Sequence, residues 1–203
     1  MTKLLSMAMP LVFLAAGSTV GADRFEQIKK NFEKADCAHF AFLSLLESEI
    51  FERVDTAQGT AYIANDGRYR VTIGGDEYLY DSHLLYSYSR ENNQVTVETV
   101  DTLSKASEQI TFVTHLDDYY MTKAIVPDKE YRLDRKSKTA ENIPDSMLVF
   151  LESDSLKLKS IEYYDINDEL NRIIFTEQNT LPACDSTIFQ PDFPDSVETI
   201  NLW

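Results

Sequence analysis

The sequence predicts a mainly β protein built on a twisted antiparallel sheet of the kind that forms a sandwich or barrel. Between residues 59 and 99, short runs rich in Tyr, Val, Ile and Thr are separated by Gly, Asn and Asp clusters. Tyr69, Val71 and Ile73 share one face of such a run, as the period of two in a strand requires. Strands joined by hairpins throughout exclude a parallel α/β sheet.

Further strands and two helices complete the predicted order. An amphipathic helix is predicted over residues 24–34, because Phe25, Ile28 and Phe32 recur at helical spacing and Asp23 is placed to cap the first turn. The other predicted elements are a long strand at 37–51, a turn at 54–57, strands at 59–64, 68–73, 77–80, 84–89 and 94–99, a helix at 101–116, strands at 119–125, 130–134, 146–152, 156–165 and 169–180, and a short last strand at 188–189.

The first 22 residues have the pattern of a cleaved secretory signal peptide. Lys3 precedes an apolar stretch at 4–16, and small residues stand before Asp23. The apolar stretch is shorter than the roughly 20 residues of a membrane span, although an uncleaved anchor is the alternative. We therefore expect residues 23–203 to form a single exported domain in the periplasm.

Charge and composition disfavour several classes of function. The chain has 34 acidic and 19 basic residues, a net charge of −15, which repels nucleic acid and anionic lipid headgroups. We find no Gly-rich phosphate loop, no zinc-binding helix motif and no nucleophile elbow. The three histidines, His39, His83 and His115, are scattered. We therefore predict no catalytic residues, no metal site and no cofactor.

Cys37 and Cys184 are the two cysteines of the chain. In an exported protein an even number of cysteines permits a disulfide, and two buried free thiols are the alternative. A bond between them would join the start of the first strand to the segment before the last one.

The aromatic and aliphatic residues of the predicted sheet suggest burial of an apolar ligand. A long acyl chain gains about 0.8 kcal/mol for each buried CH₂ group. A well-packed ordinary core fits the same periodicity equally well, so the pattern leaves both interpretations open.

Several segments resemble the LolA-type outer-membrane lipoprotein carrier family over nearly the whole length after residue 22. The strand GTAYI at 59–63 resembles the family's "G-x-hydrophobic-aromatic-hydrophobic" strand, and DGRYR at 66–70 resembles its "Pro-Gly-Arg-Phe-Arg-Trp" turn and strand. Residues 81–88, followed by NQV at 93–95, resemble its "DG … Tyr … Gln-Val" block. The segment FQPDFPDSVE at 189–198 resembles its closing "F-x-P-P-x-G-V".

This resemblance implies an incomplete antiparallel β-barrel with helices that form a lid. Its cavity would bind the acyl chains of lipoproteins, received by a monomeric carrier from an inner-membrane lipoprotein-releasing transporter and passed to an outer-membrane acceptor. We expect apolar contacts from two groups of residues, on the sheet and on the helix at 101–116. They are Phe40, Phe42, Tyr62, Tyr69, Val71, Tyr86 and Tyr88, and Ile110 and Val113.

The chain departs from the family pattern at the turn. Asn65 stands where family members place a functional Arg, Asp66 replaces the Pro, and Val71 replaces the Trp. Arg68 and Arg70 are the candidates to replace that Arg in cargo hand-off. The alternative functions are an envelope lipid-sensing domain or a protein-interaction domain of the same fold without carrier activity.

Overall fold

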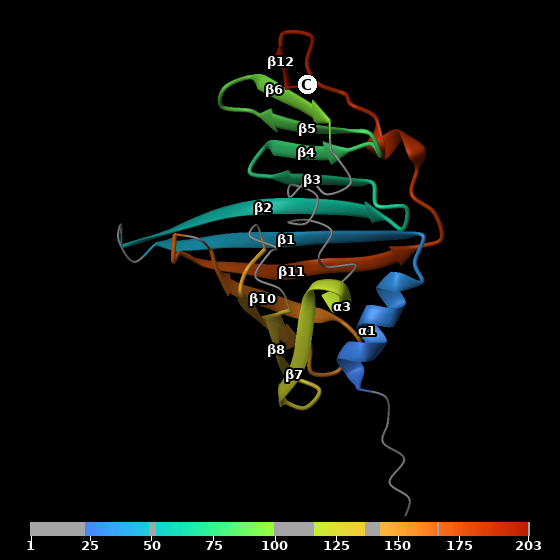
Figure 1. The fold of residues 1–203 in the computed structure, drawn as a ribbon, viewed down its shortest axis with the longest axis vertical. Helices are drawn as coiled ribbons and strands as arrows, with labels where there is room; N and C mark the ends of the chain where they lie inside the picture. Colours follow the sequence, from blue (N-terminus) through green and yellow to red (C-terminus); the bar gives the residue numbers. More distant parts are fainter. Residues whose placement is uncertain (1–22, 49–51, 100–115, 137–142, 166, 203) are drawn as a thin grey trace, which may run out of the picture.

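The computed structural model describes residues 23–48, 52–99, 116–136, 143–165 and 167–202, which form one large sheet (Figure 1). The predicted signal peptide and nearly all of the helix predicted at 101–116 lie outside these residues. The twelve strands have the spatial order β12-β6-β5-β4-β3-β2-β1-β11-β10-β9-β8-β7. Their bounds are β1 Cys37–Ser48, β2 Arg53–Ala64, β3 Tyr69–Ile73, β4 Asp76–Tyr80, β5 Leu84–Ser89, β6 Gln94–Thr99, β7 Tyr120–Val126, β8 Glu130–Arg135, β9 Ser146–Leu151, β10 Leu158–Tyr164, β11 Leu170–Leu181 and β12 Glu198–Leu202.

The protein is mainly β, as predicted, and its one large sheet is open and not closed into a barrel. β7 and β12 are its two edges, and the described strands do not pair across the gap between them. Every pairing between two described strands is antiparallel except that of β12 with β6, which is parallel. Closure would require the first and last strands to pair, because a barrel has no edges.

Turn residues decide where the predicted strands begin and end. Gly67 has a φ of 91° in the hairpin between β2 and β3, and Gly75 has a φ of 105° between β3 and β4. These left-handed conformations are open to glycine at little steric cost. The hairpins at the Asn-Asp-Gly and Gly-Gly-Asp signals therefore form where the sequence predicts them.

Two local predictions were wrong, and one strand was not predicted. Residues 54–57, predicted as a turn, belong to β2, because the long strand β1 pairs with them from Ser44 to Glu47. Ile188 and Phe189, predicted as a strand, lie in the 3₁₀ helix η1, Ser186–Phe189. The last strand is β12, for which the sequence carried no recognised signal.

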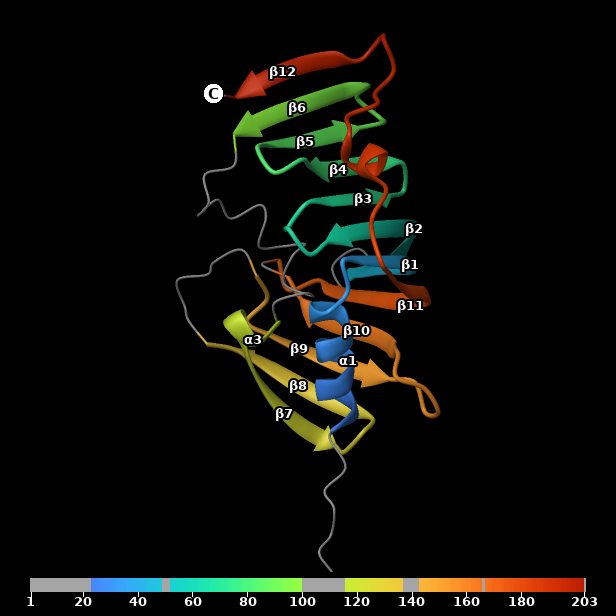
Figure 2. The same ribbon diagram turned by 90° about the vertical axis from the view of Figure 1, so that its right-hand side faces the viewer.

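Two α-helices are described, α1 (Arg24–Glu33) and the single turn α3 (Leu116–Tyr119). The Asp23 side chain accepts hydrogen bonds from the backbone N–H groups of Phe25 and Glu26, as the predicted cap requires. Phe25 and Ile28 of α1 pack on side chains of β8–β10, including Tyr131 and Ile161. Figure 2 shows α1 beside this half of the sheet and the C-terminal segment beside the other half.

Candidate functional site

We call the sheet face on which α1 packs the inner face, and the opposite face, which carries η1, the outer face. Because paired residues point to the same side, the strand registers assign each side chain to one of them. Tyr69 pairs with Ile63 and Tyr80, and Phe40 pairs with Ala61. The ring centroids of Phe32, in α1, and Phe40 are 5.1 Å apart. Phe40 and the residues paired with it across the strands therefore lie on the inner face.

An apolar cluster covers the inner face of β1, β2, β3 and β5. The rings of Phe40 and Phe175 are 5.5 Å apart, and the ring of Phe42 lies against the backbone of Gly59 on the neighbouring strand. Its buried members, which we call the inner cluster, are Ala38, Phe40, Phe42, Ala61, Ile63, Tyr69, Val71 and Leu85.

The inner cluster receives little cover from the described helices. α1 buries its apolar face mainly against β8–β10, and Phe32 is the residue of the described helices that packs on the inner cluster. Half-buried Ile73, Tyr80 and Ile173 form the rim. The inner cluster is therefore a continuous set of buried apolar side chains on an open sheet, with half-buried apolar side chains at its edge.

The structure divides the nine residues predicted to line one cavity. Phe40, Phe42, Tyr69 and Val71 lie together in the inner cluster. Tyr62, Tyr86 and Tyr88 lie on the outer face, which corrects the prediction of one common lining; Ile110 and Val113 fall outside the described residues. The reason is register: Tyr80 pairs with Leu85, so the next residue, Tyr86, points outward.

On the outer face, the C-terminal segment covers the three displaced tyrosines. Phe193 lies 6.0 Å from Tyr86 and 5.5 Å from Tyr88 between ring centroids. Phe189 is buried against Ala64 and Leu79, with Tyr62 and Tyr86 packed beside them. A disulfide between Cys37 and Cys184, with 5.1 Å between their Cα atoms, anchors this segment to β1.

Each of the three residues considered for cargo hand-off forms contacts with other residues away from the inner cluster. The Asn65 side chain donates to Asp36 at 2.9 Å. Arg68 forms an ion pair with Asp66 at 2.8 Å, and its guanidinium lies 4.8 Å from the centroid of the Phe189 ring. Arg70 lies on the outer face, away from the inner cluster.

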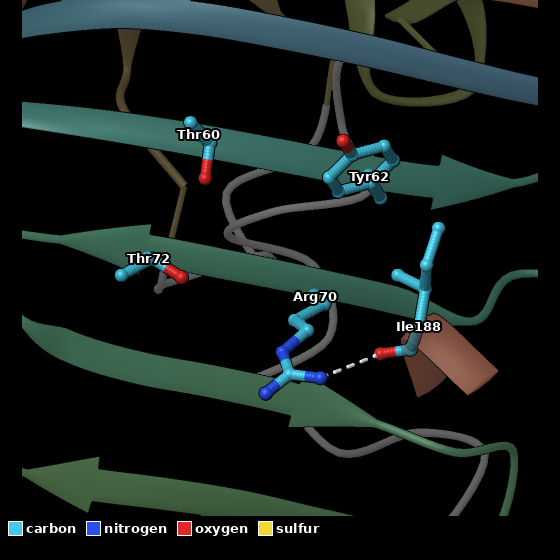
Figure 3. A pocket seen from close by; sticks show the side chains of 5 residues that line it. All are labelled: Thr60, Tyr62, Arg70, Thr72 and Ile188. Atoms are coloured by element: carbon cyan, nitrogen blue, oxygen red, sulfur yellow. Dashed lines mark hydrogen bonds between the residues drawn. The ribbon is translucent and has the colours of Figure 1, made fainter. Parts of the chain in front are cut away.

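Arg70 forms one wall of a shallow pocket on the outer face (Figure 3). Its guanidinium donates to Glu77 at 3.0 Å and to the carbonyl oxygen of Ile188 at 3.0 Å. The pocket has a volume of about 220 Å³. An adjoining groove of about 410 Å³ shares Thr60 and Thr72 with it.

Sequence reasoning missed this outer pocket. A signal existed in the Thr and Gln residues that face outward on β2 and β3, but such residues are equally typical of a solvated sheet face. Glu77 neutralises the charge of Arg70, so the pocket is polar but has no strong electrostatic potential.

The hydroxyl group of Tyr69 is the unusual polar group of the inner cluster. Tyr69 is fully buried, and its hydroxyl has no hydrogen-bond partner among the described residues. Burial is the main cause that raises the pKa of Tyr69 far above its usual value, and electrostatic repulsion from the nearby Tyr80 and Glu98 adds to it. The group is therefore a neutral O–H donor at any physiological pH.

The described residues contain no group of three or more His, Cys, Asp or Glu side chains arranged to hold a metal ion. Within the same residues, no helix is both long and apolar enough to cross a membrane.

No protein-family model and no curated protein sequence matches the chain. It is similar to several solved structures. An uncharacterized conserved protein from Thermus thermophilus matches with a TM-score of 0.51 and 11% identity, over 88% of this chain and 97% of that one. A LolA superfamily protein from Nitrosomonas europaea matches with a TM-score of 0.44 and 9% identity, over 84% and 99%. An outer membrane lipoprotein-sorting domain from Vibrio parahaemolyticus matches with a TM-score of 0.44 and 8% identity, over 81% and 94%.

The likeness to the Thermus protein shows a shared fold. The LolA superfamily, which the sequence motifs resemble, is also represented among the solved structures to which this chain is similar.

Proposed function

We propose that this protein is a periplasmic carrier that binds the acyl chains of lipoproteins against the inner cluster and moves them from the inner to the outer membrane. The observation that carries the proposal is the continuous cluster of apolar side chains formed by Phe40, Phe42, Val71 and their neighbours on one face of an open sheet. The motif resemblance to the LolA-type carriers supports it.

The chemistry of the inner cluster suits a carrier better than an enzyme. Its members are aliphatic or aromatic, and each acyl CH₂ group that they bury contributes about 0.8 kcal/mol. Contact of this kind is not directional, so cargo can be held without fixed hydrogen bonds and released when a partner offers a better apolar surface. The partners in this proposal are an inner-membrane lipoprotein-releasing transporter and an outer-membrane acceptor.

Two isoleucines on opposite faces allow a matched test of acyl binding. Ile73 and Ile174 are both half-buried, but Ile73 faces inward beside Gly59, whereas Ile174 faces outward beside Leu43. We expect Ile73→Glu to weaken binding of a palmitoylated peptide about tenfold or more, because a carboxylate at the rim must be desolvated by the chain. Ile174→Glu should leave the dissociation constant nearly unchanged. Displacement of a fluorescent apolar dye measures both.

Circular dichroism and thermal unfolding establish that both variants are folded before their affinities are compared. Equal affinities of the two variants would remove the inner cluster from the proposal. Native mass spectrometry of the protein purified from periplasm then separates a carrier, which retains a bound lipoprotein, from a lipid-sensing domain, which retains free lipid or a partner protein.

A further inference from the structure

The buried hydroxyl group of Tyr69 lacks an acceptor in the described part of the protein. Its ring packs 5.7 Å from that of Tyr80 between centroids, and it pairs across the strands with Ile63. A buried hydroxyl without a hydrogen bond destabilises a folded protein, and such groups in native structures call for an explanation. A phenylalanine would fill the same space without this cost.

The position of Tyr69 relates this hydroxyl to the proposed ligand. Tyr69 is the first residue of β3, and Ile73, which pairs with Gly59, is the last. At about 3.3 Å per residue, the inward-facing side chains of the strand form an apolar row roughly 13 Å long. The Tyr69 end also carries Glu98, in the same row of inward-facing residues, whereas the other end carries the ring of Phe42.

An acyl chain that packs against the inner cluster brings one strong acceptor with it. The chain is hydrocarbon apart from the ester or amide carbonyl at its head, and a neutral phenol is a donor that suits a carbonyl oxygen. We infer that the Tyr69 hydroxyl donates a hydrogen bond to the carbonyl oxygen of an ester- or amide-linked acyl ligand, with the tail directed toward Phe42 and Ile73. This inference rests on the proposed function and adds the ligand's linkage and orientation to it.

The consequence is a preference that a purely apolar surface does not have. The two probes are 1-palmitoylglycerol and its ether analogue 1-O-hexadecylglycerol, which share chain length and headgroup and differ in the carbonyl. We expect the wild type to bind the ester about tenfold more tightly, as a buried hydrogen bond of ordinary strength predicts. Tyr69→Phe should abolish this preference.

The same substitution should stabilise the ligand-free protein. Removal of an unsatisfied buried hydroxyl is expected to raise the midpoint of thermal unfolding by about 2–4 °C. Weaker ester binding together with higher stability is a combination that a merely structural role for Tyr69 does not produce.

Tyr80→Phe is the matched control. Tyr80 is the neighbouring inward-facing tyrosine, but its hydroxyl already donates to the carbonyl oxygen of Ser82 at 3.0 Å. We expect Tyr80→Phe to keep the ester preference and to leave the midpoint unchanged or slightly lower.

Three results would count against these conclusions, and they are distinguishable. Equal binding of ester and ether by the wild type overturns the inference alone. A lower unfolding midpoint in Tyr69→Phe shows that the hydroxyl has a partner within the protein, which also overturns it. Failure of the wild type to bind either probe overturns the proposed function, and the inference with it.

Discussion

The ring of Phe42 occupies the place where a side chain of residue 59 would begin. A Cβ atom added to Gly59 would overlap two atoms of this ring and lie 2.9 Å from the backbone carbonyl oxygen of Thr72. The ring can move, but the backbone of β3 cannot do so without disturbing its pairing with β2. Glycine at this position therefore lets an aromatic side chain of the inner cluster lie directly on the sheet.

We expect Gly59→Ala to lower the free energy of unfolding by about 1–3 kcal/mol, the usual effect of overpacking. Chemical denaturation measures the change. In a Phe42→Leu background the same substitution should cost less, because the overlapping ring is gone. An equal cost in both backgrounds would assign the effect to Thr72 and the backbone instead of Phe42.

The sheet face on which a side chain lies could be predicted where polar and apolar residues alternate strictly along a strand. It could not be predicted elsewhere. Tyr69, Val71 and Ile73 alternate with Arg70 and Thr72, and the structure gives them one common face. The run LLYSYS of β5 has large side chains at positions of both parities, so the pattern alone could not decide its face. The turn at 81–83 sets the register, and a shift of one residue would have reversed it.

At the scale of elements, the helix α1 is attached to α3 through Lys29. The Lys29 side chain is 6% exposed, and its ammonium group lies 2.7 Å from Asp117 and 2.6 Å from Glu26. Burial alone would lower the pKa of Lys29, but hydrogen bonds to Asp117 and Glu26 outweigh it and raise the pKa above its usual value. The protonated form is therefore favoured in the folded protein.

This raised pKa predicts a loss of stability at alkaline pH. Because the folded state holds the proton more tightly, the contribution of Lys29 is fully present below about pH 10.5 and lost as pH rises through the folded pKa. Buried tyrosines such as Tyr131, whose pKa burial raises to about 12, add a loss of the same sign. Denaturant unfolding of the wild type and Lys29→Met between pH 9 and 12 isolates the lysine.

We expect the stability curve of Lys29→Met to fall less steeply over this range, since the described groups that still titrate with raised pKa values in this variant are tyrosines. Parallel stability curves for the wild type and Lys29→Met would mean that the ion pairs of Lys29 with its two carboxylate partners do not stabilise the folded protein.

Most elements could be predicted because the turn signals between them are strong. β3 to β6 begin and end within about one residue of their predicted limits, at Gly and Asn turns. The first half of β2, RVDTAQ, is polar and lacks such signals, and it becomes a strand because β1 pairs with it. β12 could not be predicted, since its parallel pairing with β6 joins residues about a hundred positions apart.

At the scale of the whole molecule, the outer face depends on a returning C-terminal segment. After β11 the chain passes the disulfide at Cys184, buries Phe189 against Leu79, and reaches β12 at the far edge of the sheet. The Asn93 side chain donates to the carbonyl oxygen of Ser196 at 2.9 Å, close to the start of β12. β12 itself pairs with one strand, β6, in the described structure.

The disulfide should therefore stabilise both the whole fold and this edge in particular. It joins cysteines 147 positions apart, and its removal is expected to cost about 2–5 kcal/mol. We expect the double variant Cys37→Ala/Cys184→Ala to show a lower denaturant midpoint. In hydrogen exchange its β12 amides should lose protection more than those of β1, because β12 is an edge strand paired with β6 alone, whereas β1 is paired on both sides. A uniform loss of protection across the sheet would instead indicate that the disulfide acts mainly on the unfolded chain and that Phe189 and Phe193 hold the segment without it.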